Sequence, residues 1–363
     1  MSLRSWFMRS ARGALVALPC VAALAWSPFA AGCGGVDGGD GEPHASDPLP
    51  GDGGQPPPVD GPPCPEAASV EVTVENTRGA LAGTLEVPGG CGPFPAVVII
   101  PGSGPTDREG NSAGAGIGAG AYRLLAEGLR DRGIASIRYD KAGVGGSVAA
   151  APPDAREFRF EMGADDAGLW VKRLREDGRF ARIAVVGHSE GSLLGMLVAK
   201  EVEIEGYISI AGAGRPIGEV LREQLERGIP DGELREAAYG IIEALEGGEL
   251  VEEVPSALVE LFHPSVQPYL ISWMAYDPAV EIKGVEAPVV IVQGTTDIQV
   301  AVEDAERLAG ARGDAELVLI EGMNHVLKEA ALERAAQEKA YRDPGLPVVP
   351  RVFEVIEGFL SAR

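Results

Sequence analysis

The pattern of hydrophobic positions changes from alternating to continuous between residues 70 and 100. Residues 70–74 and 80–87 alternate apolar and polar side chains on either side of Gly79. Alternation with period two is typical of half-buried strands, so these residues predict an antiparallel hairpin. The run 96–100 (AVVII) is apolar throughout, which is typical of a parallel strand buried on both faces.

Downstream of this run, helix-like and strand-like segments alternate. Such alternation is typical of βαβ units with right-handed crossovers, so we expect an α/β fold around a parallel sheet. The predicted helices are 122–132, 160–175, 192–202 and 352–360, and the predicted strands are 134–139, 183–186, 204–210, 288–293 and 316–320.

The alternation stops between residues 215 and 283. This stretch is charged and helical in pattern, with predicted helices at 217–227, 233–245 and 256–276. An insertion of this kind predicts a helical cap over the carboxyl edge of the sheet, where open α/β sheets bind ligands. We therefore expect a cap at 215–283 and a core made of 66–214 and 284–363.

The N-terminus has a pattern that is typical of export. Three arginines precede an apolar run at 14–26, which is short for a membrane span, and small residues follow at 30–32. We expect a signal peptide over 1–32. Residues 30–33 (AAGC) resemble a bacterial lipobox, which predicts lipidation of Cys33 and a lipid-anchored protein of the cell envelope. Cleaved secretion without lipid and an uncleaved anchor are the alternatives.

Residues 33–65 are interpreted as a linker. Positions 34–63 are almost all Gly, Pro, Asp and small polar residues, which cannot bury enough apolar surface to offset their chain entropy. Cys64 and Cys91 flank the predicted hairpin and, in an exported chain, are expected to form a disulfide. A metal site is not expected, because two cysteines without a nearby histidine do not make one.

The charge balance excludes one class of partner. With 31 Lys and Arg against 54 Asp and Glu, the net charge is −23. A chain without a basic stripe has nothing to neutralise phosphates, so we expect no nucleic-acid binding. The same charge disfavours anionic substrates.

The segment GHSEG at 187–191 carries the candidate nucleophile, Ser189. It follows the predicted strand 183–186 and precedes a predicted helix, which is the context of a G-x-S-x-G nucleophile elbow. Glycines are needed at its two ends, because a Cβ there would meet neighbouring backbone in the strained turn.

The general base is predicted by elimination among four histidines. His44 lies in the linker, His188 lies inside the elbow and is expected to turn away from the serine, and His263 lies in the cap. His325 directly follows the last predicted strand, where a loop histidine can reach the nucleophile.

The acid and the oxyanion donors follow from strand ends. Asp297 comes just after the strand 288–293 and is the predicted acid. Asp304 is a weaker rival for this role. The alternative interpretation of Asp297 is an ordinary aspartate in a turn. The order Ser, Asp, His is that of α/β-hydrolases. The amides of Glu190 and Ser103 are the predicted oxyanion donors, with Gly104 beside them in the substrate site. An ordinary Gly/Pro turn is the alternative for that loop.

Five motifs together resemble bacterial α/β-hydrolase esterases of the serine aminopeptidase-like or carboxylesterase-like kind, which are often exported. The resemblance implies an eight-stranded, mostly parallel sheet, a Ser-Asp-His triad and ester hydrolysis without a cofactor. One departure is KAG at 141–143, where relatives usually carry KRG. The motifs are PGSGPTDREGN (101–111), YDKAGVGGS (139–147), VVGHSEGS (185–192), GTTDIQV (294–300) and GMNHVLK (322–328).

The expected activity is hydrolysis of a small-molecule carboxylic ester through an acyl-enzyme. The alternatives are a peptidase or amidase, a thioesterase, and a substrate-binding lipoprotein with a degenerate site. A dinucleotide site at Gly116-x-Gly118 is disfavoured, because these glycines lie well past the preceding strand. The oligomeric state is left open. Four cap residues either line an acyl pocket or pack the cap onto the sheet: Phe262, Trp273, Met274 and Tyr276.

Overall fold

The computed structural model describes residues 64–362. The predicted signal peptide at 1–32, the lipidation site Cys33 and nearly all of the linker lie outside the described residues. Among residues 64–362, no helix is long and apolar enough to cross a membrane. The predicted disulfide is confirmed, because Cys64 and Cys91 are bonded across a separation of 27 residues.

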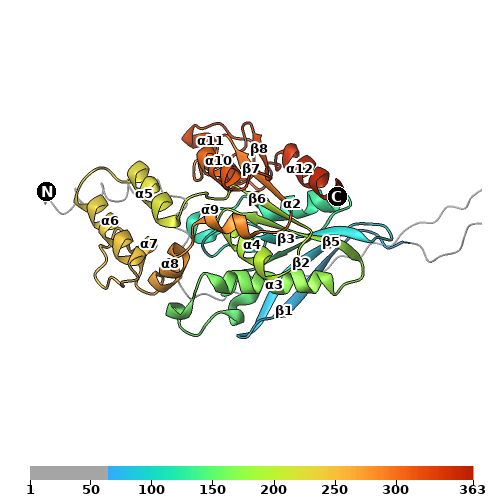
Figure 1. The fold of residues 1–363 in the computed structure, drawn as a ribbon, viewed down its shortest axis with the longest axis horizontal. Helices are drawn as coiled ribbons and strands as arrows, with labels where there is room; N and C mark the ends of the chain where they lie inside the picture. Colours follow the sequence, from blue (N-terminus) through green and yellow to red (C-terminus); the bar gives the residue numbers. More distant parts are fainter. Residues whose placement is uncertain (1–63, 363) are drawn as a thin grey trace, which may run out of the picture.

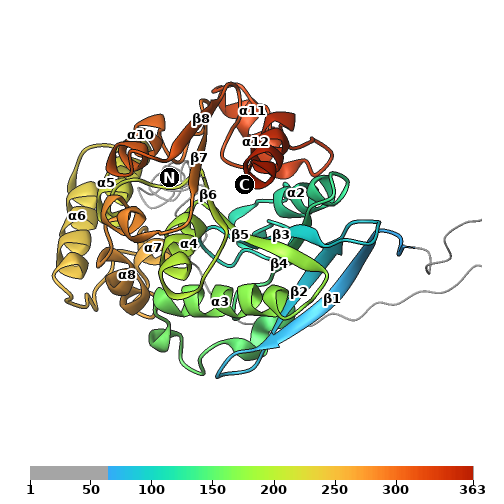
Figure 2. The same cartoon turned by 45° about the vertical axis from the view of Figure 1, so that its right-hand side comes forward.

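An eight-stranded sheet runs through the centre of the molecule (Figures 1 and 2). Its order is β1-β2-β4-β3-β5-β6-β7-β8, and only the pairs β1–β2 and β2–β4 are antiparallel. The predicted eight-stranded, mostly parallel sheet is therefore confirmed. The strands are β1 (Ala68–Glu75), β2 (Ala80–Val87), β3 (Phe94–Ile100), β4 (Ala135–Tyr139), β5 (Phe180–His188), β6 (Gly206–Ile210), β7 (Val289–Gly294) and β8 (Glu316–Ile320).

The apolar strand β3 shows why the sheet is covered on both faces. Successive side chains point to opposite faces, so Val97 and Ile99 join one core while Ala96, Val98 and Ile100 join the other. Helices α2 and α12 close the first face, and α3, α4 and α10 close the second. These helices are α2 (Ala121–Arg130), α3 (Glu161–Arg175), α4 (Glu190–Glu201), α10 (Val302–Ala311) and α12 (Pro350–Ser361).

The segment between β6 and β7 is helical and lies at one end of the sheet, at the left of Figure 1. The predicted helix 256–276 is wrong as one element, because it is broken at residues 263–266. Pro264 has no amide hydrogen to donate, so the helix does not continue through it. The helices here are α5 (Ile217–Gly228), α6 (Glu233–Glu246), α7 (Val259–Phe262), α8 (Gln267–Met274) and α9 (Pro278–Glu281).

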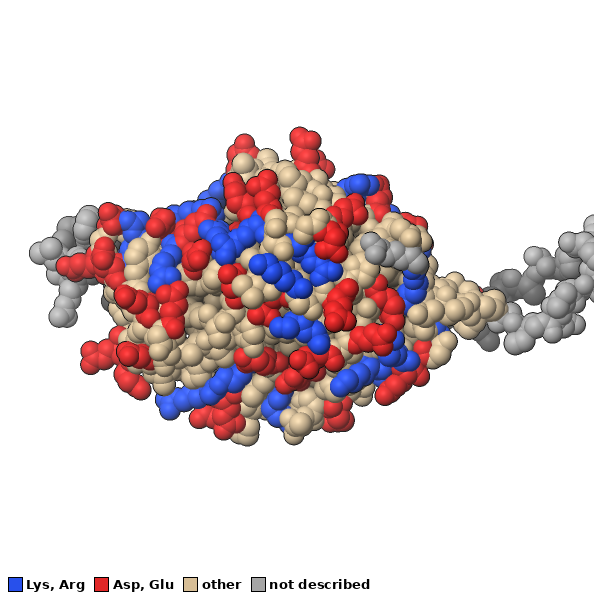
Figure 3. Space-filling view, viewed as in Figure 1, with Lys and Arg blue, Asp and Glu red and all other residues tan. Residues whose placement is uncertain are grey.

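One further helix, α11 (Arg334–Arg342), follows β8 and was not expected from the sequence. Most of its side chains are polar or charged, and only Gln337, Ala340 and Tyr341 are buried. The surface shown in Figure 3 mixes acidic and basic side chains, with Lys and Arg lying among more numerous Asp and Glu. The excess of acid is thus spread over this face.

Candidate active site

Ser189 lies at a sharp turn between β5 and α4, with φ 56° and ψ −120°. A Cβ added to Gly187 would lie 2.3 Å from the carbonyl oxygen of Gly191, and one added to Gly191 would lie 2.3 Å from that of Ile100. Both glycines are therefore required by close backbone packing, as the sequence predicts. The strained serine is held at the carboxyl edge of the sheet, in front of the amino end of α4.

His325 and Asp297 are brought together from the loops after β8 and β7. Nδ1 of His325 lies 2.8 Å from Oδ2 of Asp297. The amides of Gln299 and Val300 donate to Oδ1 of Asp297 at 2.7 and 3.0 Å. Burial on its own would raise the pKa of Asp297, but His325 and these amides bring that pKa below its ordinary value. Asp297 is thus a buried carboxylate that orients the ring of His325.

The rival acid, Asp304, has a different environment. Its carboxylate accepts from the amide of Gly214 at 3.0 Å and from the guanidinium of Arg215 at 2.9 and 2.7 Å. It therefore anchors the start of the cap to α10, and its oxygens are occupied away from His325.

Two cavities meet at Ser189, and the residues common to both are Ser103 and Ser189. We call the first the loop-side cavity, because it lies among the loops after β3, β5 and β8. It encloses about 490 Å³, including its solvent-open mouth. Its lining residues are Gly102, Ser103, Thr106, Gly110, Ser112, Ile117, Ala121, Tyr122, His188, Ser189, Gln299, His325 and Val326.

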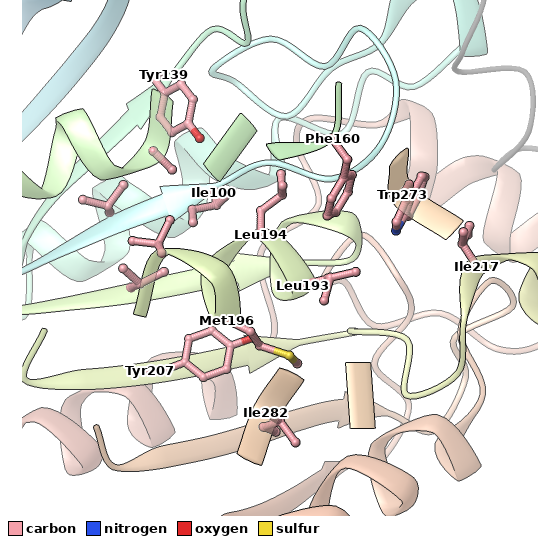
Figure 4. Close-up of a cluster of buried hydrophobic side chains, with 14 of the residues drawn as sticks. Ile100, Tyr139, Phe160, Leu193, Leu194, Met196, Tyr207, Ile217, Trp273 and Ile282 are labelled. Atoms are coloured by element: carbon pink, nitrogen blue, oxygen red, sulfur yellow. The ribbon is translucent and has the colours of Figure 1, made fainter. Parts of the chain in front are cut away.

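The second, which we call the cap-side cavity, lies between Ser189 and the helices α5, α7 and α8. It encloses about 660 Å³, measured in the same way, and its wall is largely aliphatic. Trp273 is part of this wall and stacks on Phe160 at 5.2 Å between ring centroids, as Figure 4 shows. The lining residues are Ser103, Ser189, Glu190, Leu193, Ala213, Arg215, Ile217, Val220, Leu221, Gln224, Leu261, Leu270, Trp273, Pro278 and Val300.

Three predicted substrate contacts do not line either of these cavities. Phe262 is fully buried in the hydrophobic core formed with the cap. The hydroxyl of Tyr276 donates to Glu161 at 2.8 Å, so this ring packs the cap onto the core. Gly104 lines a separate hollow together with Lys141 and Tyr269. Sequence alone did not separate these packing positions from Trp273.

His188 turns away from Ser189, as predicted, and holds the backbone that carries the candidate base. Its Nε2 lies 2.8 Å from the carbonyl oxygen of His325, and its Nδ1 lies 2.8 Å from the hydroxyl of Tyr122. Burial lowers the pKa of His188 to about 3, so the ring is neutral at pH 7. Because a carbonyl only accepts, Nε2 carries the hydrogen and Tyr122 donates to Nδ1.

The peptide groups of Gly102 are also fixed. Its amide donates to the hydroxyl of Tyr122 at 2.8 Å, and its carbonyl accepts from Nζ of Lys141 at 3.1 Å. Nζ of Lys141 also lies 2.7 Å from Oε1 of Glu190, whose side chain is fully buried. A Cβ added to Gly102 would lie 3.2 Å from the Cβ of Ser189, so this backbone abuts the candidate nucleophile.

Lys328 secures the loop that bears His325. Its side chain is buried, and Nζ donates to the carbonyl oxygens of Ala119 and Asp343. Burial lowers the pKa of Lys328 below its ordinary value. Neither Lys328 nor Tyr122 was predicted from the sequence, because an isolated lysine or tyrosine carries no signal of burial. Within residues 64–362, no cluster of three His, Cys, Asp or Glu side chains has the form of a metal site.

Comparisons with known proteins identify a family, a curated relative and solved structures of similar fold. A family model described as the alpha/beta hydrolase family matches residues 97–338. Esterase EstD from Thermotoga maritima is 30% identical over 257 residues, which are 69% of this chain and 59% of that protein. The chain therefore spans about three fifths of the length of this curated relative.

Two solved structures share the fold. Est1E from Butyrivibrio proteoclasticus with bound ferulic acid is 18% identical, covers 80% of this chain and 98% of its own, and has a TM-score of 0.51. The esterase Pf2001 from Pyrococcus furiosus is 16% identical, with 82% and 91% covered and a TM-score of 0.51. At these identities the likeness concerns the fold.

Proposed function

Because the chain belongs to the alpha/beta hydrolase family, we propose that it hydrolyses carboxylic esters with Ser189 as nucleophile, His325 as general base and Asp297 as the orienting acid. One observation carries this proposal. His325 is hydrogen-bonded to a buried carboxylate and lines the same cavity as the strained Ser189. The relative EstD, which is named an esterase, supports the ester as substrate.

The reaction proceeds in two acyl transfers. Nε2 of His325 removes the proton from Oγ of Ser189, which attacks the ester carbonyl, and the amides of Glu190 and Ser103 stabilise the oxyanion. The C–O bond to the alcohol then breaks, and His325 returns the proton to the leaving oxygen. Water then attacks the acyl-enzyme while His325 takes its proton. The acid is released when His325 returns this proton to Oγ of Ser189.

The position of His325 orients the substrate. The leaving oxygen must lie beside the group that protonates it, and His325 lines the loop-side cavity but not the cap-side cavity. We therefore assign the alcohol to the loop-side cavity and the acyl group to the cap-side cavity. The aliphatic wall of the latter favours an uncharged, apolar acyl chain.

Export and lipidation at Cys33 form part of the same proposal. The motif at 30–33 supports lipidation, and the Cys64–Cys91 disulfide supports an oxidising compartment. A radiolabelled fatty acid should label the full chain but not Cys33→Ser. An unlabelled wild-type chain would exclude the anchor.

Hydrolysis of p-nitrophenyl esters from acetate to palmitate by the full chain tests the activity, with Ser189→Ala as the control. Turnover that requires Ser189 supports the proposal, and the preferred chain length measures the cap-side cavity. Absence of ester turnover in a folded protein that instead cleaves aminoacyl amides would replace the esterase by a peptidase.

A further inference from the structure

Lys141 contacts the loop after β3 at Gly102 and has no role in the chemistry described above. It follows the end of β4, and the preceding Asp140 is fixed by hydrogen bonds from the amide and guanidinium of Arg108. The lysine side chain is largely buried, with 20% of its surface exposed. Its ammonium group is therefore held in a fixed position beside the loop after β3.

The ammonium of Lys141 contacts one half of a peptide group whose other half is the amide of Ser103. The carbonyl of Gly102 and the N–H of Ser103 belong to the same planar unit, and this bond is not among the cis peptides. In a trans peptide the C=O and N–H point in opposite directions. A hydrogen bond that fixes the Gly102 carbonyl, at 3.1 Å from Nζ, therefore also fixes the direction of the Ser103 amide.

The amide of Gly102 cannot replace that of Ser103, because it already donates to Tyr122. Ser103 is shared by the two cavities that meet at Ser189. Lys141 also pairs with the carboxylate of Glu190, the residue whose amide is the other oxyanion donor. One ammonium thus touches both segments that surround the reacting carbonyl.

We propose that Lys141 is a positioning residue that aligns the Gly102–Ser103 peptide so that the Ser103 amide faces the oxyanion formed on Ser189. The positive charge at the carbonyl end also polarises the peptide and strengthens its N–H as a donor. This inference rests on the proposed hydrolase function. The alternative is a simpler role, in which Lys141 only forms the ion pair with the buried side chain of Glu190.

The experiment compares Lys141→Met in two backgrounds, the wild type and Glu190→Gln. We expect kcat to fall roughly 10- to 100-fold in both backgrounds with KM little changed, because one oxyanion donor is misaligned. Affinity for an alkyl trifluoromethyl ketone, which forms a tetrahedral adduct with the serine, should fall by the same factor. Lys141→Arg, which keeps a charged donor, should recover part of kcat.

Lys200→Met is the matched control, because Lys200 forms a lysine–glutamate pair of the same 2.7 Å length with Glu281, away from Ser189. Its kinetics should equal those of the wild type. Recovery of kcat by Lys141→Met in the Glu190→Gln background would overturn the proposal and leave only charge neutralisation. Unchanged kcat and ketone affinity in Lys141→Met would also overturn it.

Two further measurements distinguish a variant that fails to fold, and a wild type that is not a hydrolase, from a failure of the role proposed for Lys141. The thermal midpoint of each variant tests whether it is folded, and if Lys141→Met unfolds, Lys141→Leu, which also has no donor, is used with the same expectation of reduced ketone affinity. Ester turnover by the wild type tests the proposed function itself. A wild type that turns over no acyl substrate and binds no ketone contradicts the hydrolase, whereas an active wild type with unaffected variants contradicts only the role of Lys141.

Discussion

The two cavities that meet at Ser189 are built in different ways. The cap-side cavity is walled mainly by aliphatic side chains on helices, and the loop-side cavity is walled by His188 at the end of β5, by His325 and by several hydroxyls. In the proposed reaction, helices of the cap contribute shape and apolar surface, whereas the loops at the sheet edge contribute proton transfer and hydrogen bonds. If the proposed function holds, this difference predicts that acyl specificity and chemistry can be altered separately.

The largest effect should come from Ser189, one of the two residues that both cavities share. Ser189→Ala removes the proposed nucleophile, so kcat for every ester should fall by on the order of 10⁴-fold or more, whatever the acyl chain or alcohol. Steady-state hydrolysis of p-nitrophenyl esters measures this. Near-wild-type turnover would mean that another group attacks the carbonyl.

A slightly smaller effect should come from the loop side alone. Asp297→Asn keeps the size of the side chain but removes the charge that orients and stabilises the protonated His325, so kcat should fall roughly 10³- to 10⁴-fold. The preference among acyl chains should remain that of the wild type, which a series of esters with one alcohol would show. A change in that preference would contradict the separation of the two cavities.

The cap side is tested by filling its cavity. Ala213→Leu adds three carbons at a half-buried position of the wall, so long acyl chains should lose roughly 10- to 100-fold in kcat/KM. Acetate esters should be affected less, because a two-carbon acyl group fills little of the cavity. Equal losses for acetate and octanoate would show that the acyl group lies elsewhere.

A pH effect on stability should come from His188 on the loop side. Its pKa is about 3 in the folded protein against 6.5 for an ordinary histidine, so the unfolded chain binds a proton below pH 6.5 that the folded chain rejects. The free energy of unfolding should therefore fall as the pH drops from 6.5 toward 3, by up to about 1.4 kcal/mol per pH unit.

Urea unfolding at pH 7 and pH 5 measures this slope. His188→Gln keeps an amide hydrogen for the carbonyl of His325 but cannot titrate, so its stability should be less dependent on pH than that of the wild type. Parallel slopes for the two proteins would contradict a neutral, buried His188.

The smallest effect concerns the alcohol. The hydroxyl of Ser112 is buried in the loop-side wall and has no hydrogen-bond partner within residues 64–362. If a hydroxylated alcohol binds there, Ser112→Ala should lower kcat/KM for a glycerol ester by roughly 3- to 10-fold and leave a propyl ester of the same acid unchanged. Equal effects on both esters would remove Ser112 from alcohol recognition.

Much of the core and of the candidate site could be predicted because it depends on local pattern. The continuous run of β3 and the βα alternation predicted the parallel sheet, and Ser189, Asp297 and His325 each follow a predicted strand. Residues at strand ends of a parallel sheet come to one edge whatever the details of packing. The cap was less predictable, since Phe262, Trp273 and Tyr276 share one sequence character but face a core, a cavity and Glu161.

By itself the sequence determined the order of the eight strands, the elbow glycines, the triad candidates and the cysteine pair. Tertiary structure alone decided that Tyr122 and His188 connect the Gly102 amide to the carbonyl of His325, and that Lys141 reaches both Gly102 and Glu190. The physical reason is that periodicity and turn chemistry are local properties of the chain. Hydrogen bonds between residues far apart in sequence depend on how the loops pack at the sheet edge, and no local pattern records that.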